Sequence, residues 1–393
     1  MANLLEKSSI VLTPTGYSED AIHNVKPSSE PFGDMGLIKN GTSTRINSQG
    51  LVETVASHTP RIDYSKGEGA ILVELVGTNQ LSYTETLTQS SVWSGAGEFT
   101  SSVTMTDPRG NTSSVSNIFR YSSGSNAGKF QSAASASTGQ GVGLSAWVYN
   151  PDGGTQQVWI GYGNSGSGNG SFHSVTNSWK RITHITTGSV QPSEFHIAPA
   201  VSSNLRVWGC QFEKESGIGK DGKVSSYMPS LGGGTGTRSR DNYANGGDAA
   251  LIGQTEGVFY FEGASLYDAI AGRGMALSDG TATNRVVIYF DFASQKLRGT
   301  IRDGGGANIA ITGNVTDQTA FNKVAFKYKS GDVALWINGT EAVTSTSTFS
   351  FTSDLNELAF DQGNGAVHLE GFIKQVAVFK EVLSDAELAA LTS

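Results

Sequence analysis

Three aromatic residues are the side chains of this sequence best placed to bind a sugar. Trp93 lies in "SSVWSGAGE", Tyr162 in "IGYGNSG" and Tyr267 in "SLYDAIAGRG", each beside glycine-rich segments. The apolar face of a sugar ring stacks on indole and phenol rings, which lose little conformational entropy when they bind. We therefore expect a glycan-binding surface that includes Trp93, Tyr162 and Tyr267.

The other tryptophans singled out lie in strand-like patterns instead of loops. Trp147 is in "GLSAWVYN", Trp208 in "NLRVWGCQFE" and Trp336 in "DVALWING", while Trp179 is in "SWKRIT". Apolar residues alternate along these stretches, as expected for strands with buried faces. We predict that these four rings belong to the core.

Four aspartates, Asp279, Asp291, Asp303 and Asp361, are the candidates for acid–base catalysis. A glycosidase needs two carboxylates about 5 to 10 Å apart in a cleft. Each of these aspartates stands beside a turn or at a strand end. Because aspartate stabilises turns through local backbone hydrogen bonds, we expect a structural role for them and no catalytic residue.

The sequence also has no clear motif for a metal, a phosphate or a nucleophile. Its six histidines are scattered and none forms a His-Glu-x-x-His pair, although His184 and His196 flank one strand–turn region. The segment "GNSGSGNGS" at 163–171 lacks the final glycine of a nucleophile elbow and the lysine of a phosphate-binding loop, so we expect a surface loop. No metal and no cofactor is predicted.

Composition predicts an all-β protein. The chain has 393 residues, of which 50 are glycine, and only 16% are charged. Chains of this kind form many short strands joined by turns. The net charge of −8 argues against nucleic-acid binding, which needs clustered lysine and arginine. A single cysteine, Cys210, excludes an internal disulfide framework.

The N-terminal sequence "MANLLEKSSIVLTPTGYS" holds only a short apolar run. This is too short for the core of a secretory signal peptide, and no stretch approaches the roughly 20 apolar residues of a membrane span. We expect synthesis in a cytoplasm without an export signal and no membrane insertion. A protein of this kind that acts outside the cell is released by lysis.

Changes of pattern along the chain predict three regions and a linker. Residues 1–80 hold short apolar stretches that cannot form a core alone, so we expect them to pack on other chains or on the next domain. Residues 81–230 and 243–393 carry strand patterns suited to two-sheet sandwiches, and the glycine-rich residues 231–242 are the predicted linker.

The last region carries the clearest local signals. In "NKVAFKYKSGDVALWING" two alternating runs flank Ser330–Asp332, and Asn338-Gly339 suits a turn with positive φ at both positions. The terminal "LSDAELAALTS" places Glu387 three residues after Ser384, which is the capping-box spacing. We predict a hairpin followed by a further turn, and one short C-terminal helix.

The segment "TSTRINSQGLVETVASHTPRIDYSKGEGAILVE" resembles a stretch near the N-terminus of many bacteriophage tail-fibre and other virion surface proteins. The matching residues form an Arg-x-Asn-x-x-Gly-Leu-x-Glu phrase, a Pro-Arg-x-Asp-Tyr phrase and a leucine-rich stretch that ends in glutamate: Arg45, Asn47, Gly50, Leu51, Glu53, Pro60, Arg61, Asp63, Tyr64, Leu72 and Glu74. The family's usual Glu-Pro is Glu74-Leu75 here.

Two further resemblances cover most of the remaining chain. Residues 178–183, 206–213 and 225–238 resemble a carbohydrate-binding-module-type sandwich, and "KVAFKYKSGDVALWINGT" with "IKQVAVFKEVLSDAELAAL" resembles a laminin-G or concanavalin-type jelly roll. Both imply β-sandwich domains. Because some concanavalin-type domains bind calcium through loop carboxylates, Asp361 with Asn364 stays open as a calcium site.

Together these resemblances imply a non-enzymatic phage particle protein: a tail fibre, a spike, a head fibre or a head-decoration subunit. They imply attachment to other virion proteins through the N-terminal segment, a homotrimer, and binding of host-surface polysaccharide at the virion surface. Two alternatives are a virion-associated polysaccharide depolymerase and a purely structural head or tail component.

Overall fold

The computed structural model describes residues 4–26, 33–124, 127–133, 141–162, 168–186, 194–214, 223–268, 272–291 and 295–393. The chain divides into two compact units. Unit 1 comprises Met1–Ser48, Val55–Leu75 and Ser239–Ser393, and unit 2 comprises Gln49–Thr54 and Val76–Arg238. Each unit is described by itself below.

Almost all the regular structure is β, which confirms the predicted fold class. The elements assigned to unit 1 are α1 Leu4–Lys7, β1 Ser8–Ser18, β2 Ala21–Asn24, β3 Met35–Ile38, β4 Ser43–Ile46, β6 Ile62–Asp63, β7 Ala70–Val73, β20 Asn242–Ala244, β21 Glu256–Ser265, β22 Arg273–Ser278, β23 Asn284–Phe290, β24 Lys296–Asp303, β25 Asn308–Asn314, β26 Asn322–Lys329, β27 Val333–Ile337, β28 Thr340–Ser345, β29 Glu357–Ala359, β30 Gly371–Phe379 and α2 Asp385–Thr392. Those of unit 2 are β8 Gly77–Asn79, β9 Ser94–Ala96, β10 Glu98–Thr106, β11 Thr112–Arg120, β12 Gly128–Ser132, β13 Val142–Tyr149, β14 Gln156–Tyr162, β15 Asn169–Val175, β16 Lys180–Thr186, β17 Glu194–Ala198, β18 Ser203–Lys214 and β19 Gly236–Arg238. Strand β5, Val52–Val55, ends at the boundary between the units.

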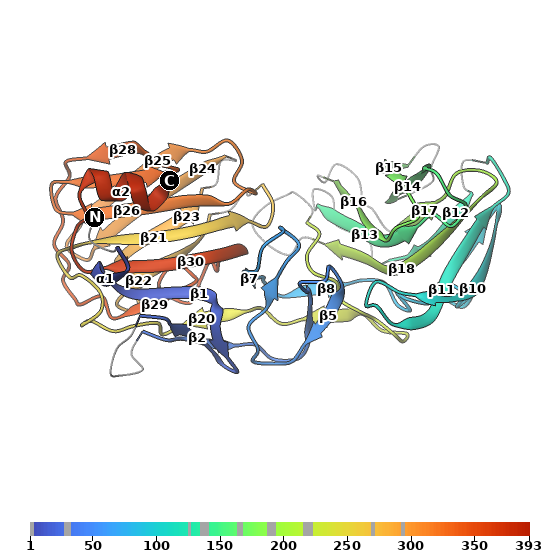
Figure 1. Cartoon of the computed structure of the whole chain (residues 1–393), viewed down its shortest axis with the longest axis horizontal. Coiled ribbons are helices and arrows are strands. Elements are labelled where there is room, and N and C mark those ends of the chain that lie inside the picture. Colours follow the sequence, from blue (N-terminus) through green and yellow to red (C-terminus); the bar gives the residue numbers. More distant parts are fainter. Residues whose placement is uncertain are drawn as a thin grey trace. The chain divides into compact units, whose positions relative to one another are not determined.

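Unit 1 is a sandwich of two antiparallel sheets (Figure 1). The larger sheet has the order β20-β3-β2-β1-β30-β21-β26-β27-β28, with β6 and β7 joined beside β30, and the smaller has the order β25-β24-β23-β22-β29. One core cluster joins both sheets: Phe261, Phe326 and Val378 come from the larger and Val286 and Ile301 from the smaller. The two sheets therefore share one core. The other face of the larger sheet is also buried in part, because Val258, Tyr260 and Trp336 pack in a second cluster with Leu388 of α2.

The N-terminal strands belong to this sandwich. Strand β1 pairs with β2 on one side and with β30 on the other, and Ile10 and Leu12 are fully buried in the shared core. This differs from the predicted boundary at residue 80. The short apolar stretches pack within the same chain: β1 and β7 pair with β30, and β3 pairs with β20.

Unit 2 is a second sandwich. Its seven-stranded sheet has the order β10-β11-β18-β13-β16, with β8 and β19 beside β18, and its five-stranded sheet has the order β15-β14-β17-β12-β9. Leu144 and Phe212 of the first sheet and Val158 and Ile197 of the second are fully buried in one cluster. The strands expected in "GLSAWVYN", "QQVWIGYG" and "NLRVWGCQFE" are confirmed as β13, β14 and β18.

The predicted linker 231–242 is partly structured. Arg238 ends β19 and is 2% exposed, and its guanidinium donates to the Ser225 hydroxyl at 2.9 Å. Asp241 is also 2% exposed. A flexible linker does not bury charged side chains. A continuous run of exposed residues is found only at the start of this segment, over residues 231–235.

Local sequence signals explain the turns and the helix. Asn338 and Gly339 have φ of 48° and 84°, so the two-residue turn between β27 and β28 has the predicted positive φ at both positions. At α2, the Ser384 backbone N–H donates to Glu387 Oε2 at 3.0 Å, which confirms the capping box.

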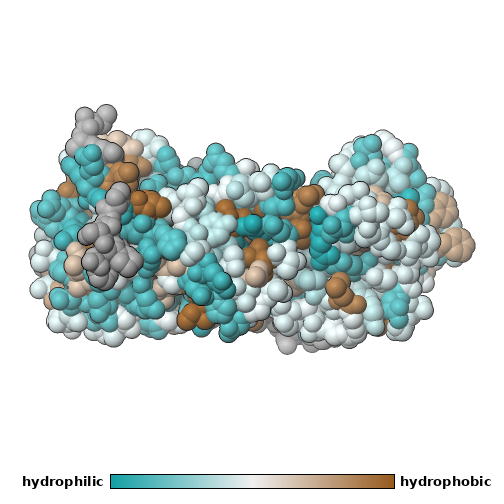
Figure 2. All heavy atoms as spheres, turned by 60° about the horizontal axis from the view of Figure 1, so that its bottom comes forward, coloured by the Kyte–Doolittle hydropathy of each residue, from teal (hydrophilic) through white to brown (hydrophobic). Residues whose placement is uncertain are grey.

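Exposed apolar side chains are scattered over the molecule. On the face drawn in Figure 2 they appear as separate small groups among hydrophilic residues. The most exposed include Leu231, Phe99 and Phe172, at 68%, 66% and 65%. Within the described ranges, no helix has the length and apolar character needed to cross a membrane.

Candidate functional site

The candidate site lies on the outer face of the smaller sheet of unit 1. Along β23, Val286, Ile288 and Phe290 point into the core, so the alternate residues Arg285, Val287 and Tyr289 take the opposite face. The same alternation in β24 buries Leu297 and Ile301 in the core. It places Arg298, Thr300 and Arg302 beside the outward residues of β23.

Strand register arranges these outward residues in three parallel rows. The first row is Arg285, Arg302 and Asn308, the second is Val287, Thr300 and Ala310, and the third is Tyr289, Arg298 and Thr312. Successive residues on one face of a strand are about 7 Å apart. A row of small side chains therefore lies between two rows that carry long ones.

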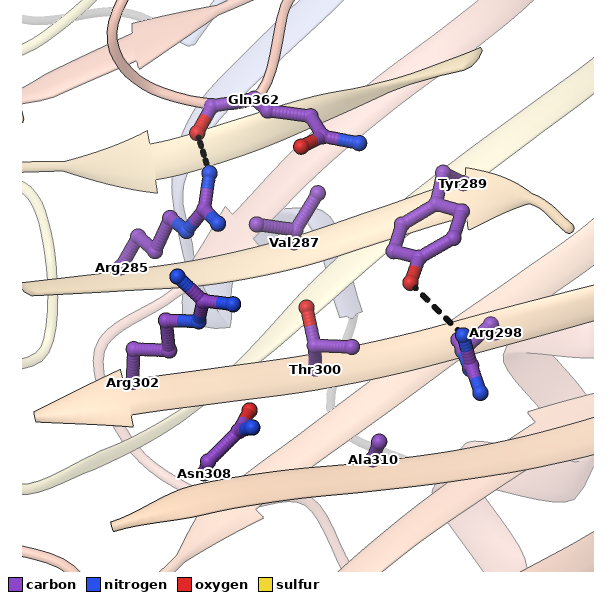
Figure 3. Close-up of a pocket in the computed structure, with 9 residues that line it drawn as sticks. All are labelled: Arg285, Val287, Tyr289, Arg298, Thr300, Arg302, Asn308, Ala310 and Gln362. Carbon is purple, nitrogen blue, oxygen red and sulfur yellow. Dashed lines mark hydrogen bonds between the residues drawn. The ribbon is translucent and has the colours of Figure 1, made fainter. Parts of the chain in front are cut away.

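This difference in side-chain size produces a groove of about 350 Å³, shown in Figure 3. Its floor is the middle row, and the loop after β29 contributes Gln362 at one edge. Its described lining residues are Arg285, Val287, Tyr289, Arg298, Thr300, Arg302, Asn308, Ala310 and Gln362. The volume lies in the range of small-molecule sites.

Arg285 and Arg302 form the polar wall of the groove. The guanidinium of Arg285 is buried, donates from Nη1 to the carbonyl oxygen of Gln362 at 2.6 Å, and leaves its Nε without a hydrogen-bond partner. Arg302 is exposed, and no ion pair or hydrogen bond joins its side chain to the described residues. Figure 3 shows the two guanidinium groups close to each other at the same end of the groove.

The electrostatic consequence is a local concentration of positive charge in an acidic protein. Burial, and then the charge of Arg302, lower the pKa of Arg285 below its ordinary value, while Tyr289 and Asp361 act in the opposite sense. The chain as a whole carries a net charge of −8. An anion in this groove would relieve both the desolvation and the repulsion.

The other wall is internally bonded. Arg298 donates to the Tyr289 hydroxyl at 3.2 Å and to Thr312 Oγ1 at 3.2 Å, and lies 3.5 Å from Asp291. The hydrogen bond with Tyr289 is the main cause of a raised pKa of Arg298. This wall is therefore fixed in position, whereas Arg302 remains available to a ligand.

The groove supplies groups for binding. Guanidinium, amide and hydroxyl groups donate and accept hydrogen bonds, and the exposed side chain of Ala310 offers apolar surface to a ring. None of the nine lining residues carries a carboxylate, a thiol or an imidazole. General acid–base catalysis of glycosidic bonds uses paired carboxylates, which this lining does not provide.

The residues predicted from the sequence lie elsewhere. Trp93 is 1% exposed; its ring packs edge-on against Phe195 at 5.9 Å, and its indole N–H donates to the Tyr83 carbonyl at 3.1 Å. A ring enclosed in this way offers no face to a sugar. The loop position of Trp93 suggested exposure, but its indole completes the core of unit 2.

Tyr162 and Tyr267 are also not free platforms. Tyr162 is 9% exposed, and its ring centroid lies 6.5 Å from that of His184. Residues 163–167 of the adjacent glycine-rich loop lie outside the described residues. Tyr267, partly exposed, donates its hydroxyl to Glu370 at 2.6 Å in unit 1. The structure brings none of the three predicted residues into the groove or together.

The four tryptophans expected in the core behave largely as predicted. Trp147, Trp208 and Trp336 are 7%, 1% and 7% exposed. Trp179 is the exception, because it is partly exposed. It donates its indole N–H to Thr106 at 2.8 Å.

The aspartates act as turn supports. The Asp303 carboxylate accepts backbone N–H groups from Gly305 and Ala307 at 2.9 Å, which contributes to a lowered pKa. Asp361 accepts from Gly363 at 2.6 Å and from Asn364 at 3.2 Å. The carboxylate of Asp361, suggested with Asn364 as a calcium site, is thus engaged by its own loop. No group of three or more His, Cys, Asp or Glu among the described residues is arranged to hold a metal ion.

Sequence reasoning missed the row of Arg285, Arg302 and Asn308 because its residues lie on three different strands. They become neighbours only through the pairing of these strands. One signal was present: in "KLRGTIRD" the polar residues Arg298, Thr300 and Arg302 alternate with residues that face the core. Such a strand exposes a polar face. Only the register of β23 against β24 shows that Arg285 stands opposite Arg302.

Comparison with known proteins agrees with this fold. The family model of the concanavalin A-like lectin/glucanases superfamily matches residues 266–389, which include the sheet that carries the groove. This part of unit 1 is therefore similar to a concanavalin A-like β-sandwich domain. No curated protein sequence matches the chain.

Three solved structures are similar to part of the chain and match 37–39% of it. The CBM40 of the Ruminococcus gnavus IT-sialidase, bound to alpha2,3 sialyllactose, is 21% identical over 37% of this chain and 86% of that chain, with a TM-score of 0.32. The NanB sialidase from Streptococcus pneumoniae is 16% identical over 37% of this chain and 25% of that chain, with a TM-score of 0.32. The binding domain of botulinum neurotoxin serotype D is 11% identical over 39% and 40%, with a TM-score of 0.31.

Proposed function

We propose that this protein is a lectin-like subunit that binds saccharide in the outer-face groove of unit 1. The observation that carries the proposal is the groove itself: about 350 Å³, with a floor of small side chains and a wall in which Arg285 Nε has no hydrogen-bond partner and Arg302 is exposed. Its position within the segment that matches the concanavalin A-like lectin/glucanases superfamily supports a saccharide ligand.

We further propose that the protein binds saccharide without hydrolysing it. The lining residues carry no carboxylate, and the aspartates outside it are engaged in turns. We therefore propose no enzymatic activity. Incubation of the protein with a bound polysaccharide should give retention without release of shorter products.

The biological setting we propose is the surface of a bacteriophage particle. Its support is the resemblance of residues 42–74 to virion surface proteins. In this setting, weak single-site contacts would be multiplied by identical subunits, here a homotrimer, and by copies on the particle. Mass spectrometry of purified particles should detect the polypeptide, and sedimentation of the purified protein should give the mass of three chains; a lone monomer absent from particles would contradict this setting.

Saccharide binding is tested by filling the groove. Ala310 is exposed on the floor, so the variant Ala310→Trp has room to fold and places an indole where the ligand would lie. The matched control is Thr344→Trp, which adds the same ring to an exposed position on β28 of the other sheet. On a glycan array, the control should keep the wild-type binding and Ala310→Trp should lose it. Equal binding by the two variants would refute the site.

A further inference from the structure

We infer that the groove selects a saccharide with an anionic substituent, a carboxylate or a sulfate, and seats that substituent between Arg285 and Arg302. This inference rests on the proposed saccharide-binding function of the groove. It adds the chemical class of the ligand and the residues that bind its anionic substituent.

The first observation is the direct pairing of like charges. Arg285 and Arg302 are register partners on adjacent antiparallel strands. Partners in this position have Cβ atoms only about 4.5 to 5.5 Å apart, and like charges placed there destabilise a sheet. A folded sheet that keeps two arginines in this arrangement has a ready-made position for a negative charge.

The second observation is an unused donor inside the wall. Arg285 is 8% exposed and its Nε has no hydrogen-bond partner, while Nη1 is held by Gln362. A buried, unsatisfied donor on a charged group costs free energy that a ligand oxygen would recover. Because the Gln362 carbonyl fixes one side of the guanidinium, its remaining donors are held in one orientation.

The third observation is that no described carboxylate forms an ion pair with either arginine. Asp361 is near enough to raise the pKa of Arg285, but its carboxylate accepts three backbone N–H groups of its own loop. No ion pair joins Arg285 or Arg302 to a carboxylate among the described residues. The pair therefore differs from Arg298, which already lies 3.5 Å from Asp291.

The remaining lining favours a sugar as the carrier of this charge. Beside the two arginines, Thr300 and Asn308 present a hydroxyl and an amide, and Ala310 provides a small apolar contact. Planar guanidinium groups match carboxylate and sulfate oxygens with paired hydrogen bonds. A ring with hydroxyls and one anionic substituent uses all of these groups together.

The inference is tested by comparing matched ligands that differ only in charge. The full chain is titrated with oligogalacturonides and with the same oligomers after reduction of their carboxylates, and with sulfated chondroitin oligomers before and after desulfation. The anionic member of at least one pair should bind about 10- to 100-fold more tightly than its neutral counterpart, as expected for charge-assisted hydrogen bonds. Which pair shows the difference identifies carboxylate or sulfate.

The variant Arg302→Ala should abolish that preference, and its exposure lets the chain fold. The control is Lys329→Gln, which removes one positive charge from the other sheet of the same unit and should keep the preference. Equal binding of charged and neutral members, with Ala310→Trp still blocking both, would overturn the inference and leave the saccharide function standing. The inference would also be overturned if Lys329→Gln lost the preference for the charged ligand as completely as Arg302→Ala does. That result would show that the net charge of the unit, and not the arginine pair, attracts the ligand. Failure to bind any member would remove both proposals.

Discussion

Arg285 and Arg302 lie directly opposite each other on strands β23 and β24, on the outer face of a sheet whose other face is core. Arg285 is buried and Arg302 exposed, and neither is neutralised by a described carboxylate. The relationship is unfavourable for the free protein and favourable for a complex with an anion. It therefore connects the stability of unit 1 to its proposed function.

The first prediction is that removing this repulsion stabilises the free protein. The variant Arg302→Gln should raise the free energy of unfolding of unit 1 by about 0.2–1 kcal/mol, since like charges directly opposite each other oppose sheet formation. Hydrogen exchange of β23 and β24 peptides at increasing urea concentration measures this change. A loss of stability would mean that Arg302 is a structural residue of the sheet.

A second prediction concerns the buried cluster of Arg61, Glu74 and Asp241 in unit 1. The Arg61 guanidinium contacts Glu74 at 2.5 Å and also pairs with Asp241, and all three side chains are buried. Burial alone would lower the pKa of Arg61, but the two carboxylates raise it above its ordinary value.

The variant Arg61→Met leaves two carboxylates buried without their cation, and should destabilise unit 1 by about 3–5 kcal/mol. Urea unfolding measures the loss. The triple change of Arg61, Glu74 and Asp241 to apolar residues is the control and should recover part of it. An unchanged midpoint for Arg61→Met would show that the cluster contributes little.

The third prediction is a pH dependence caused by Lys39. This side chain is 1% exposed and donates to Ser43 and Thr59, each at 3.0 Å, and burial lowers its pKa to about 8. The unfolded state, with the ordinary pKa of 10.5, binds the proton more tightly between pH 8 and 10.5. Stability from this group therefore rises with pH across that window.

The variant Lys39→Met should lack this contribution. Between pH 8 and 9.5 the wild-type free energy of unfolding should increase by about 1.5 kcal/mol relative to the variant. The buried tyrosines also titrate at high pH, but they are present in both proteins. Their contribution therefore cancels when the free energy of unfolding of the variant is subtracted from that of the wild type. Parallel curves would show that Lys39 keeps an ordinary pKa.

The fourth prediction tests whether Trp93 is a core residue or a ligand-binding residue. Because its ring is enclosed in the core of unit 2, Trp93→Ala should lower the free energy of unfolding of that unit by about 3–5 kcal/mol. Saccharide affinity, measured where the variant is still folded, should match wild type because the groove lies in unit 1. A selective loss of affinity with unchanged stability would restore the sequence-based assignment of Trp93 to the binding surface.

Sequence patterns predicted much of the fold because its strands and turns follow local rules. The alternation in residues 322–337, the Asn338-Gly339 turn and the capped C-terminal helix are decided by nearby residues, and each is confirmed. The place of β1 beside β30 is decided by a partner more than 350 residues away, so the boundary predicted at residue 80 differs from the observed one.

The groove could not be predicted from local sequence patterns, because it is formed by residues of different paired strands. Loop position suggested that Trp93 would be exposed, yet long-range packing buries it. Conversely, Arg285 and Arg302 looked like ordinary polar residues of two strands. They become a pair of adjacent positive charges only through the register of β23 against β24.

The most direct test of the account is a crystal structure of the chain with an acidic oligosaccharide bound. We predict ligand density in the groove, with a carboxylate or sulfate between Arg285 and Arg302 and the sugar ring over Thr300 and Ala310. Ligand density on another surface, with this groove empty at saturating ligand, would contradict the account.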